Sequence, residues 1–298
     1  MAIVRHLVTL TAADGQVHDA LFTIDERALR IRHRSTGRRT AIVHVHGIMG
    51  NFLVGTLRFY PAPLARAGFP VLVLETRMAN VGQLFGQAIF EDAIRDIDAA
   101  VRWLRSEGYD TLIISGYSSG ATLATRYAAT HHVPTLRGLL CLGNPWGLPE
   151  SMERRARLYH AKPDYDELTA TVLEALGDTP DDPDLDRLVI VEQSRGPTTR
   201  PGDSEVYTYR TWWHSRGPRA TSAKAHLQIA QVWAPILLVQ GNRDQVVFHH
   251  EAHDLARVAR EGGNPDVEVV TIDGASHSFE GCEIATRDAV ISWLKRKA

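Results

Sequence analysis

Short apolar runs alternate along much of the chain with longer segments in which apolar residues recur every three or four positions. Near the N-terminus, apolar and polar residues alternate in "HLVTL", "VHDALFTI" and "ALRIRHRS". This pattern predicts antiparallel strands joined by turns at Asp14-Gly15 and Asp25-Glu26. Uninterrupted apolar runs predict buried strands at residues 41–47, 70–75, 111–115, 136–143, 235–241 and 267–272.

Helical periodicity separates these predicted strands. After residue 92, apolar residues at helical spacing define one face, and Gly108 follows as a stop signal. Further helices are predicted over residues 119–132 and 249–263. The last helix is predicted to place four residues on one face: Ala285, Ala289, Val290 and Trp293. Strands that alternate with helices in this way indicate an α/β fold, with a mostly parallel sheet and helices on both faces.

The alternation stops between residues 146 and 231, where charged residues, prolines and aromatics are frequent. Helical stretches are predicted at Glu150–His160 and Asp166–Leu176, followed by an acidic link, "DTPDDPDLD", and an exposed loop, "QSRGPTTRPGDS". Because the sheet pattern then resumes, residues 1–145 and 232–298 are predicted to form one core. Residues 146–231 are predicted to be a cap over the C-terminal ends of the strands, where open α/β sheets place ligand sites.

Composition narrows the class of protein. The 298 residues are 44% hydrophobic and 23% charged, which is typical of a globular protein with a large core. A formal net charge of -2 argues against a nucleic-acid partner. Neither a secretory signal nor an apolar stretch of membrane-spanning length is evident, so we expect a cytoplasmic protein with no membrane partner. Homo-oligomerisation is left open.

The segment "TLIISGYSSGATLAT" contains the pattern G-x-S-x-G, with Ser118 between Gly116 and Gly120. It follows a predicted buried strand and precedes a predicted helix, which is the context that a nucleophile elbow requires. Such a turn lifts the serine hydroxyl above the sheet and directs the free N–H groups of the helix N-terminus at the reacting atom. The alternative is a polar residue in a tight strand-to-helix turn.

Two further residues follow strands later in the chain. His277 lies in "DGASHSF" after the strand at 267–272, and Asp244 lies in "QGNRDQ" after the strand at 235–241. Taken singly, the histidine could be a loop residue that caps or packs, and the aspartate a turn former. A reactive serine, however, needs a base and a carboxylate that orients the base.

The order Ser118, Asp244, His277, each just beyond a predicted strand, resembles the serine hydrolases of the α/β-hydrolase fold over about residues 40–297. The resemblance implies that these three residues form a catalytic triad. It extends to "VHVHGIMGN", where His46-Gly47 matches the family's oxyanion-hole loop. There the backbone N–H groups of Ile48 and Ser119 are implied to bind the oxyanion, with His46 bracing the loop.

Other candidate residues have simpler explanations. His44, on a buried strand, is expected to be a core histidine with satisfied hydrogen bonds, and Ser276 and Ser278 are expected to be structural. The pair His249-His250 lacks acidic or cysteine partners at ligand spacing, and Cys141 and Cys282 show no metal-ligand or disulfide pattern. No cofactor or metal is therefore expected.

The segment "EVYTYRTWWHSRGPRA" carries the information about substrate, and it has two interpretations. Trp212 and Trp213 could line a pocket in which an arginine such as Arg210 binds an anionic group. Alternatively, the tryptophans anchor the cap and the arginines are solvated, which is the interpretation favoured for most of the arginines. Tyr117, where relatives more often have histidine, is a further candidate substrate contact.

The expected function is hydrolysis of a carboxylic ester, or of a related thioester or lactone, through an acyl-enzyme. The substrate is expected to be a medium-sized organic molecule. A more limited resemblance to bacterial relatives of siderophore-ester hydrolases rests on "HGIMGNF" and "FEDAIRDIDAAV". The alternatives are an acyltransferase, a biosynthetic thioesterase or carbon–carbon bond hydrolase on the same fold, and a non-catalytic small-molecule receptor.

Overall fold

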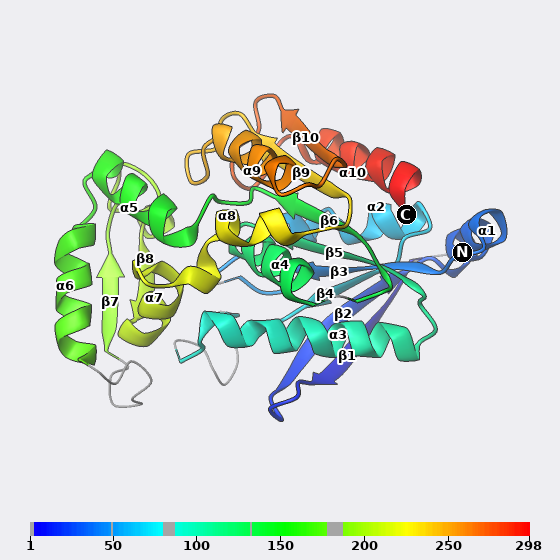
Figure 1. The fold of residues 1–298 in the computed structure, drawn as a ribbon, viewed down its shortest axis with the longest axis horizontal. Helices are drawn as coiled ribbons and strands as arrows, with labels where there is room; N and C mark the ends of the chain where they lie inside the picture. The colour runs from blue at the N-terminus through cyan, green and yellow to red at the C-terminus, as the bar shows by residue number, and fades with distance from the viewer. Residues whose placement is uncertain (1–2, 49, 80–86, 132, 178–186) are drawn as a thin grey trace.

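A computed structural model describes residues 3–48, 50–79, 87–131, 133–177 and 187–298 of the chain. Its centre is an eight-stranded sheet in the order β1-β2-β4-β3-β5-β6-β9-β10 (Figure 1). Only the pairings of β1 with β2 and of β2 with β4 are antiparallel. The strands are β1 (Val4–Thr11), β2 (Val17–Ile24), β3 (Thr40–Val45), β4 (Val71–Leu74), β5 (Thr111–Tyr117), β6 (Leu136–Leu142), β9 (Ile236–Gly241) and β10 (Val267–Ile272).

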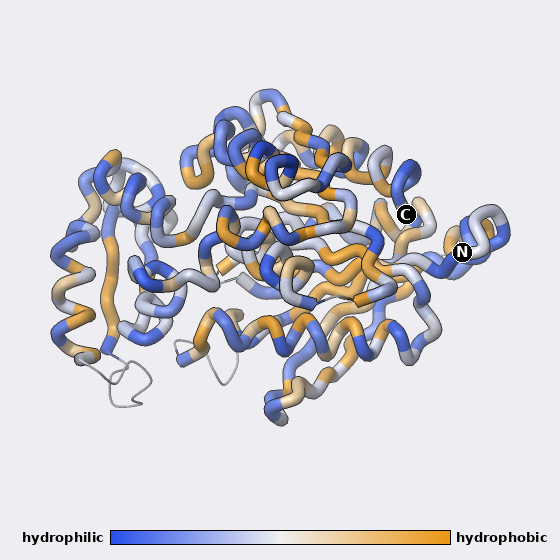
Figure 2. Tube along the Cα trace, viewed as in Figure 1, coloured by the Kyte–Doolittle hydropathy of each residue, from blue (hydrophilic) through white to orange (hydrophobic). Residues whose placement is uncertain are grey.

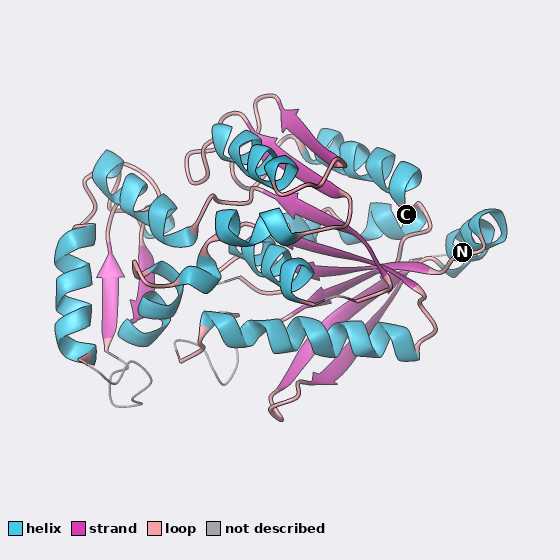
Figure 3. Cartoon of the chain, in the orientation of Figure 1, coloured by secondary structure: helices cyan, strands magenta, loops and turns pink. Residues whose placement is uncertain are grey.

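Helices cover both faces of this sheet (Figure 3). On one face, α3 (Ile94–Ser106), α4 (Ser119–Thr130) and α9 (His250–Glu261) bury Ile97, Tyr127 and Leu255 against the strands. On the other, α2 (Pro61–Arg66) and α10 (Glu283–Lys297) bury Leu64 and Trp293. Figure 2 shows hydrophobic residues concentrated along the strands between these layers. The predicted α/β sheet with helices on both faces is confirmed.

Two predictions near the chain ends are wrong. The segment "ALRIRHRS" is not a strand but part of α1 (Glu26–Thr36). Its helix begins where the Asp25 side chain accepts a hydrogen bond from the Ala28 N–H, and it ends at Gly37 with φ 69°. In α10, Val290 and Trp293 are buried as expected, but Ala285 is exposed. The buried face there continues through Thr286 and Leu294 instead.

The chain between β6 and β9 leaves the sheet and forms a smaller unit, at the left of Figure 1. It contains α5 (Leu148–Tyr159), α6 (Tyr165–Leu176), the antiparallel pair β7 (Leu188–Val191) and β8 (Glu205–Thr208), and α7 (Tyr209–Arg216). A hydrophobic cluster of its own includes Met152, Leu168, Val172, Tyr207 and Trp212. We call residues 146–231 the inserted segment.

The last part of the inserted segment returns onto the main core. The short helix α8 (Ala225–Gln228) and the flanking turns η5 (Thr221–Ala223) and η6 (Ile229–Gln231) lie against α4 and α9. Ala223, Ala225 and Ile229 accordingly belong to the hydrophobic cluster of the sheet and not to that of α5–α7.

The two loops predicted in the inserted segment have different outcomes. The acidic link at residues 178–186 lies outside the described residues. The loop at 193–204 is exposed over residues 197–202 only, because Ser194 and Gly196 are buried and Arg195 is half-buried. Among the helices of the described ranges, none is long and apolar enough to cross a membrane.

Candidate active site

The sheet order brings four loops together at the C-terminal edge of the parallel strands. Ser118 follows β5, Asp244 follows β9 and His277 follows β10, while His46 and Gly47 follow β3, which pairs with β5. Residues that follow parallel strands meet at the same sheet edge. Side chains 159 residues apart, Ser118 and His277, consequently come into contact.

The backbone of Ser118 has φ 54° and ψ -125°, a conformation that residues with side chains rarely adopt. The glycines on either side permit it by allowing close approach. A Cβ on Gly116 would lie 2.1 Å from the Gly120 carbonyl oxygen, and a Cβ on Gly120 would lie 2.2 Å from the His46 carbonyl oxygen. The G-x-S-x-G pattern therefore has a steric origin: β5, α4 and the loop after β3 meet without room for another carbon.

Asp244, His277 and Ser118 form a continuous hydrogen-bonded chain. Asp244 Oδ2 lies 2.7 Å from His277 Nδ1, and His277 Nε2 lies 3.0 Å from Ser118 Oγ. An ionised carboxylate can only accept, so Nδ1 carries the imidazole proton and donates it to Asp244. Nε2 is then the acceptor for the Ser118 hydroxyl, which is the arrangement that a general base requires.

Asp244 is held as an anion by its surroundings. It is buried, and burial opposes ionisation, but the electrostatic interaction with His277, the hydrogen bond from His277 and two backbone N–H groups lower the pKa of the carboxyl below its usual value. Oδ1 accepts from the N–H groups of Val246 and Val247, at 2.8 and 2.9 Å. Oδ2 accepts from His277 Nδ1 at 2.7 Å and from Gln240 Nε2 at 2.9 Å. All the acceptor positions of this carboxylate are thus used.

The loop after β3 is braced by His46. Thr76 donates its backbone N–H and its hydroxyl to His46 Nε2, at 3.1 and 3.0 Å, so Nδ1 carries the proton and donates to the Gly47 carbonyl oxygen at 2.6 Å. Burial lowers the pKa of His46 to about 4, and the ring is neutral. His46 thus fixes the loop that carries Ile48, as predicted.

Replacing His46 with alanine is expected to lower the free energy of unfolding by about 3 kcal/mol. The change leaves the buried Thr76 N–H without an acceptor and opens a void beside the loop. Urea denaturation of both proteins would measure this difference. The exposed His253 provides a matched control, because His253→Ala should change stability by less than about 0.5 kcal/mol. A loss below about 1 kcal/mol for His46→Ala would contradict the bracing role.

The two residues expected to bind an oxyanion through their backbone N–H groups are Ser119, which follows Ser118 in the chain, and Ile48, which lines the same pocket as Ser118. Ser119 is the first residue of α4, so its N–H is among those that have no acceptor within the helix. Ile48 is half-buried and lines the same pocket as Ser118. The assignment of these two N–H groups as oxyanion donors stays a prediction.

Ser118 and His277 line a pocket between the core and the inserted segment. The core contributes apolar residues and Tyr117, whose ring centroid lies 5.1 Å from that of His277. The inserted segment contributes four charged side chains: Arg155, Arg195, Glu205 and Arg216. Of these, Glu205 and Arg216 lie in the segment "EVYTYRTWWHSRGPRA" that the sequence singled out.

The other candidate substrate contacts are placed differently. Trp212 is fully buried and packs against Tyr165 inside the inserted segment, and Trp213 is half-buried against the same cluster. Arg210 is half-buried on α7. None of the three is among the residues that line the pocket of Ser118. Solvation, the interpretation favoured for most of the arginines in this segment, holds for the exposed Arg219 but not for the buried Arg216.

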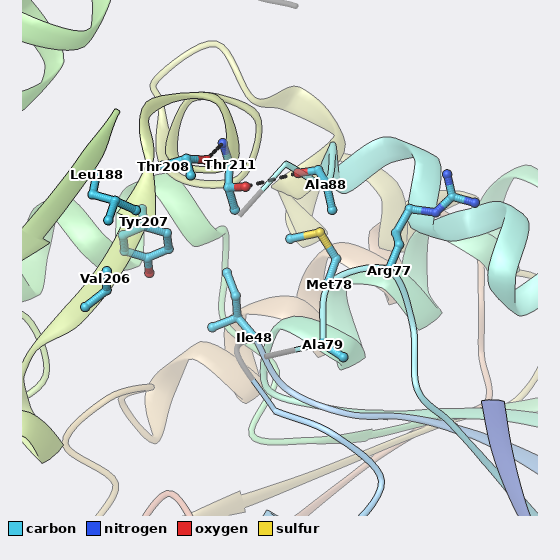
Figure 4. Close-up of a pocket in the computed structure, with 10 residues that line it drawn as sticks. All are labelled: Ile48, Arg77, Met78, Ala79, Ala88, Leu188, Val206, Tyr207, Thr208 and Thr211. Atoms are coloured by element: carbon cyan, nitrogen blue, oxygen red, sulfur yellow. Dashed lines mark hydrogen bonds between the residues drawn. The ribbon is translucent and has the colours of Figure 1, made fainter. Parts of the chain in front are cut away.

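A second pocket is also lined by Ile48 (Figure 4). Its walls are mostly apolar. The core contributes Met78, Ala79 and Ala88, and the inserted segment contributes residues of β7, β8 and α7, including Leu188 and Val206. Thr211 Oγ1 donates a hydrogen bond of 3.3 Å to the Ala88 carbonyl oxygen across the pocket. Since Ile48 lines both pockets, the apolar one adjoins the space above Ser118.

The remaining candidates have structural contacts. His44 is fully buried between the hydroxyls of Ser115 and Thr56, at 2.8 and 3.2 Å, which is the satisfied core histidine expected. The hydroxyls of Ser276 and Ser278 lie 3.3 Å apart. Across the described ranges, no group of three or more histidine, cysteine, aspartate or glutamate side chains is placed to hold a metal ion.

Comparison with known proteins identifies the family. The model of the alpha/beta hydrolase family matches residues 42–286, which is most of the chain. The protein belongs to the α/β-hydrolase family. This membership accounts for the strand order and the sharp turn at Ser118. A search of curated protein sequences finds no match, and no comparison bears on the likeness to siderophore-ester hydrolases.

Solved structures share this α/β-hydrolase fold at low sequence identity. The esterase Pf2001 of Pyrococcus furiosus is 17% identical, with a TM-score of 0.69 over 99% of this chain and 92% of its own. Est1E of Butyrivibrio proteoclasticus, with bound ferulic acid, is 14% identical, with a TM-score of 0.69 over 97% and 98%. DcsB, in complex with a substrate analogue, is 13% identical, with a TM-score of 0.73 over 99% and 100%. The likeness spans the inserted segment as well as the core.

Proposed function

We propose that this α/β-hydrolase is a serine hydrolase that cleaves a carboxylic ester of a medium-sized organic molecule. The observation that carries the proposal is the hydrogen-bonded chain from Asp244 through His277 to Ser118. The occurrence of esterases among the structural neighbours supports an ester in preference to other acyl compounds. Thioesters and lactones are cleaved by the same chemistry and are the next substrates to examine.

In the first half of the proposed reaction, Ser118 Oγ attacks the ester carbonyl carbon while His277 Nε2 takes the hydroxyl proton. Asp244 keeps the imidazole in the required tautomer and stabilises its protonated form. The N–H groups of Ile48 and Ser119 stabilise the oxyanion. The tetrahedral intermediate collapses when His277 returns the proton to the leaving oxygen, which releases the alcohol and leaves an acyl group on Ser118.

In the second half, His277 Nε2 takes a proton from water, and the resulting hydroxide attacks the acyl carbonyl carbon. Collapse of this second intermediate returns the proton to Ser118 Oγ and releases the carboxylic acid. We propose that the inserted segment acts as a cap in both halves. It forms one wall of the pocket through Arg155, Arg195, Glu205 and Arg216, and so limits both water and substrate access to Ser118.

A fluorophosphonate probe is expected to form one adduct per chain, on the peptide that contains Ser118. The probe reacts with a serine only where a base removes the hydroxyl proton and N–H donors stabilise the phosphoryl oxygen. Intact-mass measurement and peptide mapping would detect the adduct. Heat-denatured protein should not react. An unlabelled native protein would contradict the proposal and favour a non-catalytic receptor. Labelling at another residue would contradict the assignment of Ser118 as the nucleophile.

A further inference from the structure

The pocket of Ser118 carries an excess of positive charge. Three guanidinium groups, of Arg155, Arg195 and Arg216, line it together with a single carboxylate, that of Glu205. All four side chains come from the inserted segment. A buried group of like charges is costly unless counter-charges accompany it, so the partners of each group indicate whether the excess is compensated within the protein.

Two of the guanidinium groups share the one carboxylate. Glu205 is buried between Arg155 and Arg216, with closest distances of 3.3 and 3.7 Å. Arg155 also donates to the Ser194 carbonyl oxygen at 2.8 Å, and Arg216 donates to the Tyr207 hydroxyl at 3.0 Å. Burial opposes ionisation of Glu205, but the neighbouring arginines outweigh it and lower the pKa to about 2. The contacts among Arg155, Glu205 and Arg216 therefore hold these side chains in place, and the three together carry one net positive charge.

Arg195 carries the third guanidinium group of the pocket. It is half-buried, and in the described part of the chain its guanidinium has no hydrogen bond or ion pair to protein. Its backbone N–H donates to the Asp203 carbonyl oxygen at 3.0 Å, which fixes the chain at this point. The Arg195 side chain lines both the pocket of Ser118 and an outer pocket beside His277, so it stands where a substrate would enter.

The outer pocket has charges of both signs. Arg243, exposed on its rim, adds a cation, and Asp203 adds a carboxylate. Asp203 Oδ2 already accepts from the backbone N–H and the hydroxyl of Thr198, at 3.1 and 2.6 Å. Among the described residues, the Asp203 carboxylate forms no ion pair with the Arg195 guanidinium. The net charge of the two pockets together is still positive. Apart from the Asp244–His277 pair, they contain four arginines and two carboxylates.

We propose that the substrate is an ester that carries a free carboxylate, and that Arg195 binds this carboxylate. The inference rests on the proposed ester hydrolysis and names the substrate class of the same site. A guanidinium presents two parallel N–H donors that match the two oxygens of a carboxylate, and it remains charged at every physiological pH. The apolar pocket that Ile48 also lines suits the uncharged remainder of the molecule.

The test compares two pairs of esters, each pair consisting of a carboxylate and its neutral methyl ester. Mono-p-nitrophenyl glutarate carries the charge on the acyl side, and 4-butyryloxybenzoate carries it on the alcohol side. The wild type is expected to show a kcat/KM at least tenfold higher for the charged member of one pair. In Arg195→Gln the charged-to-neutral ratio should fall by about 10- to 100-fold, mainly through KM, because one charge-assisted bidentate contact is lost.

Two further variants separate charge from geometry. Arg195→Lys keeps the charge without the planar fork, so its ratio should lie between those of the wild type and Arg195→Gln. Arg157→Gln removes an exposed arginine of α5 and serves as the control for net charge, with a ratio within twofold of the wild type. Fluorophosphonate labelling and thermal unfolding of Arg195→Gln would test whether the variant is folded.

The outcomes distinguish this inference from the proposed function. If the wild type is neither labelled nor active on any of the four esters, the hydrolase proposal itself fails. If labelling and ester hydrolysis depend on Ser118 but neither charged ester is preferred, the inference about the carboxylate is overturned alone. It is equally overturned if Arg195→Gln keeps the wild-type ratio.

Discussion

Replacement of Ser118 with alanine is expected to lower kcat/KM for a neutral p-nitrophenyl ester by roughly 10⁴- to 10⁶-fold. The alanine variant lacks the only oxygen within hydrogen-bond distance of His277 Nε2 among the described residues. No acyl-enzyme can then form, and hydrolysis is left to water assisted by the oxyanion donors. The positive φ of residue 118 is kept, because the neighbouring glycines that permit it are unchanged.

Initial rates measured with wild type and variant at the same enzyme concentration would check this result. Ser106→Ala, an exposed position at the end of α3, is the matched control and should retain at least half of the wild-type activity. Thermal unfolding should show that the Ser118→Ala protein is folded. Retention of more than about 1% of wild-type kcat/KM would mean that another group is the nucleophile.

Replacement of Asp244 with asparagine is expected to lower kcat/KM by about 10³- to 10⁴-fold, a magnitude seen when this member of a triad is changed in other hydrolases. The reason lies in the hydrogen bonds of the carboxylate. Oδ1 accepts two backbone N–H groups, so the asparagine oxygen takes that position and its NH₂ group faces His277 Nδ1. The imidazole must then accept at Nδ1 and carry its proton on Nε2, where it cannot take the Ser118 proton.

In the wild type, the Gln240 amide nitrogen donates to Asp244 Oδ2. In the variant, the asparagine NH₂ takes this position, so two donors face each other. We therefore expect a loss of stability of about 1–3 kcal/mol in addition to the loss of activity. Kinetic measurements between pH 6 and 9, with urea denaturation of both proteins, would separate the two effects. Asp166→Asn, at an exposed position on α6, is the control and should change kcat/KM by less than twofold. Activity of Asp244→Asn within tenfold of the wild type would contradict the proposed role.

The residues proposed to react could be recognised before the structure was known, because their signals are local. Ser118 is marked by flanking glycines between an apolar strand and a helix, and Asp244 and His277 each follow an apolar strand. In a parallel sheet, the position of a residue after its strand is enough to predict which edge it occupies. The hydrogen bonds among these three side chains agree with that expectation.

A local sequence pattern does not identify the structure of a segment when two different structures can show the same pattern. In "ALRIRHRS", apolar and basic residues alternate as in a strand, yet the segment is helical and Ile31 is 59% exposed. The decisive signals lie at its ends, in the cap at Asp25 and in Gly37. Trp212 shows the same difficulty in the inserted segment, since a tryptophan that lines a pocket and one that fills a core have the same sequence pattern.

The sequence by itself determined the α/β fold and the three residues proposed for catalysis, because strand periodicity and residue order are properties of the chain. Only the tertiary structure decided which charges face those residues. Arg155, Arg195, Glu205 and Arg216 come from α5, a loop, β8 and α7, with no common spacing. Their convergence depends on how the inserted segment packs over the sheet edge. That packing is set by long-range apolar contacts, which leave no periodic trace in the sequence.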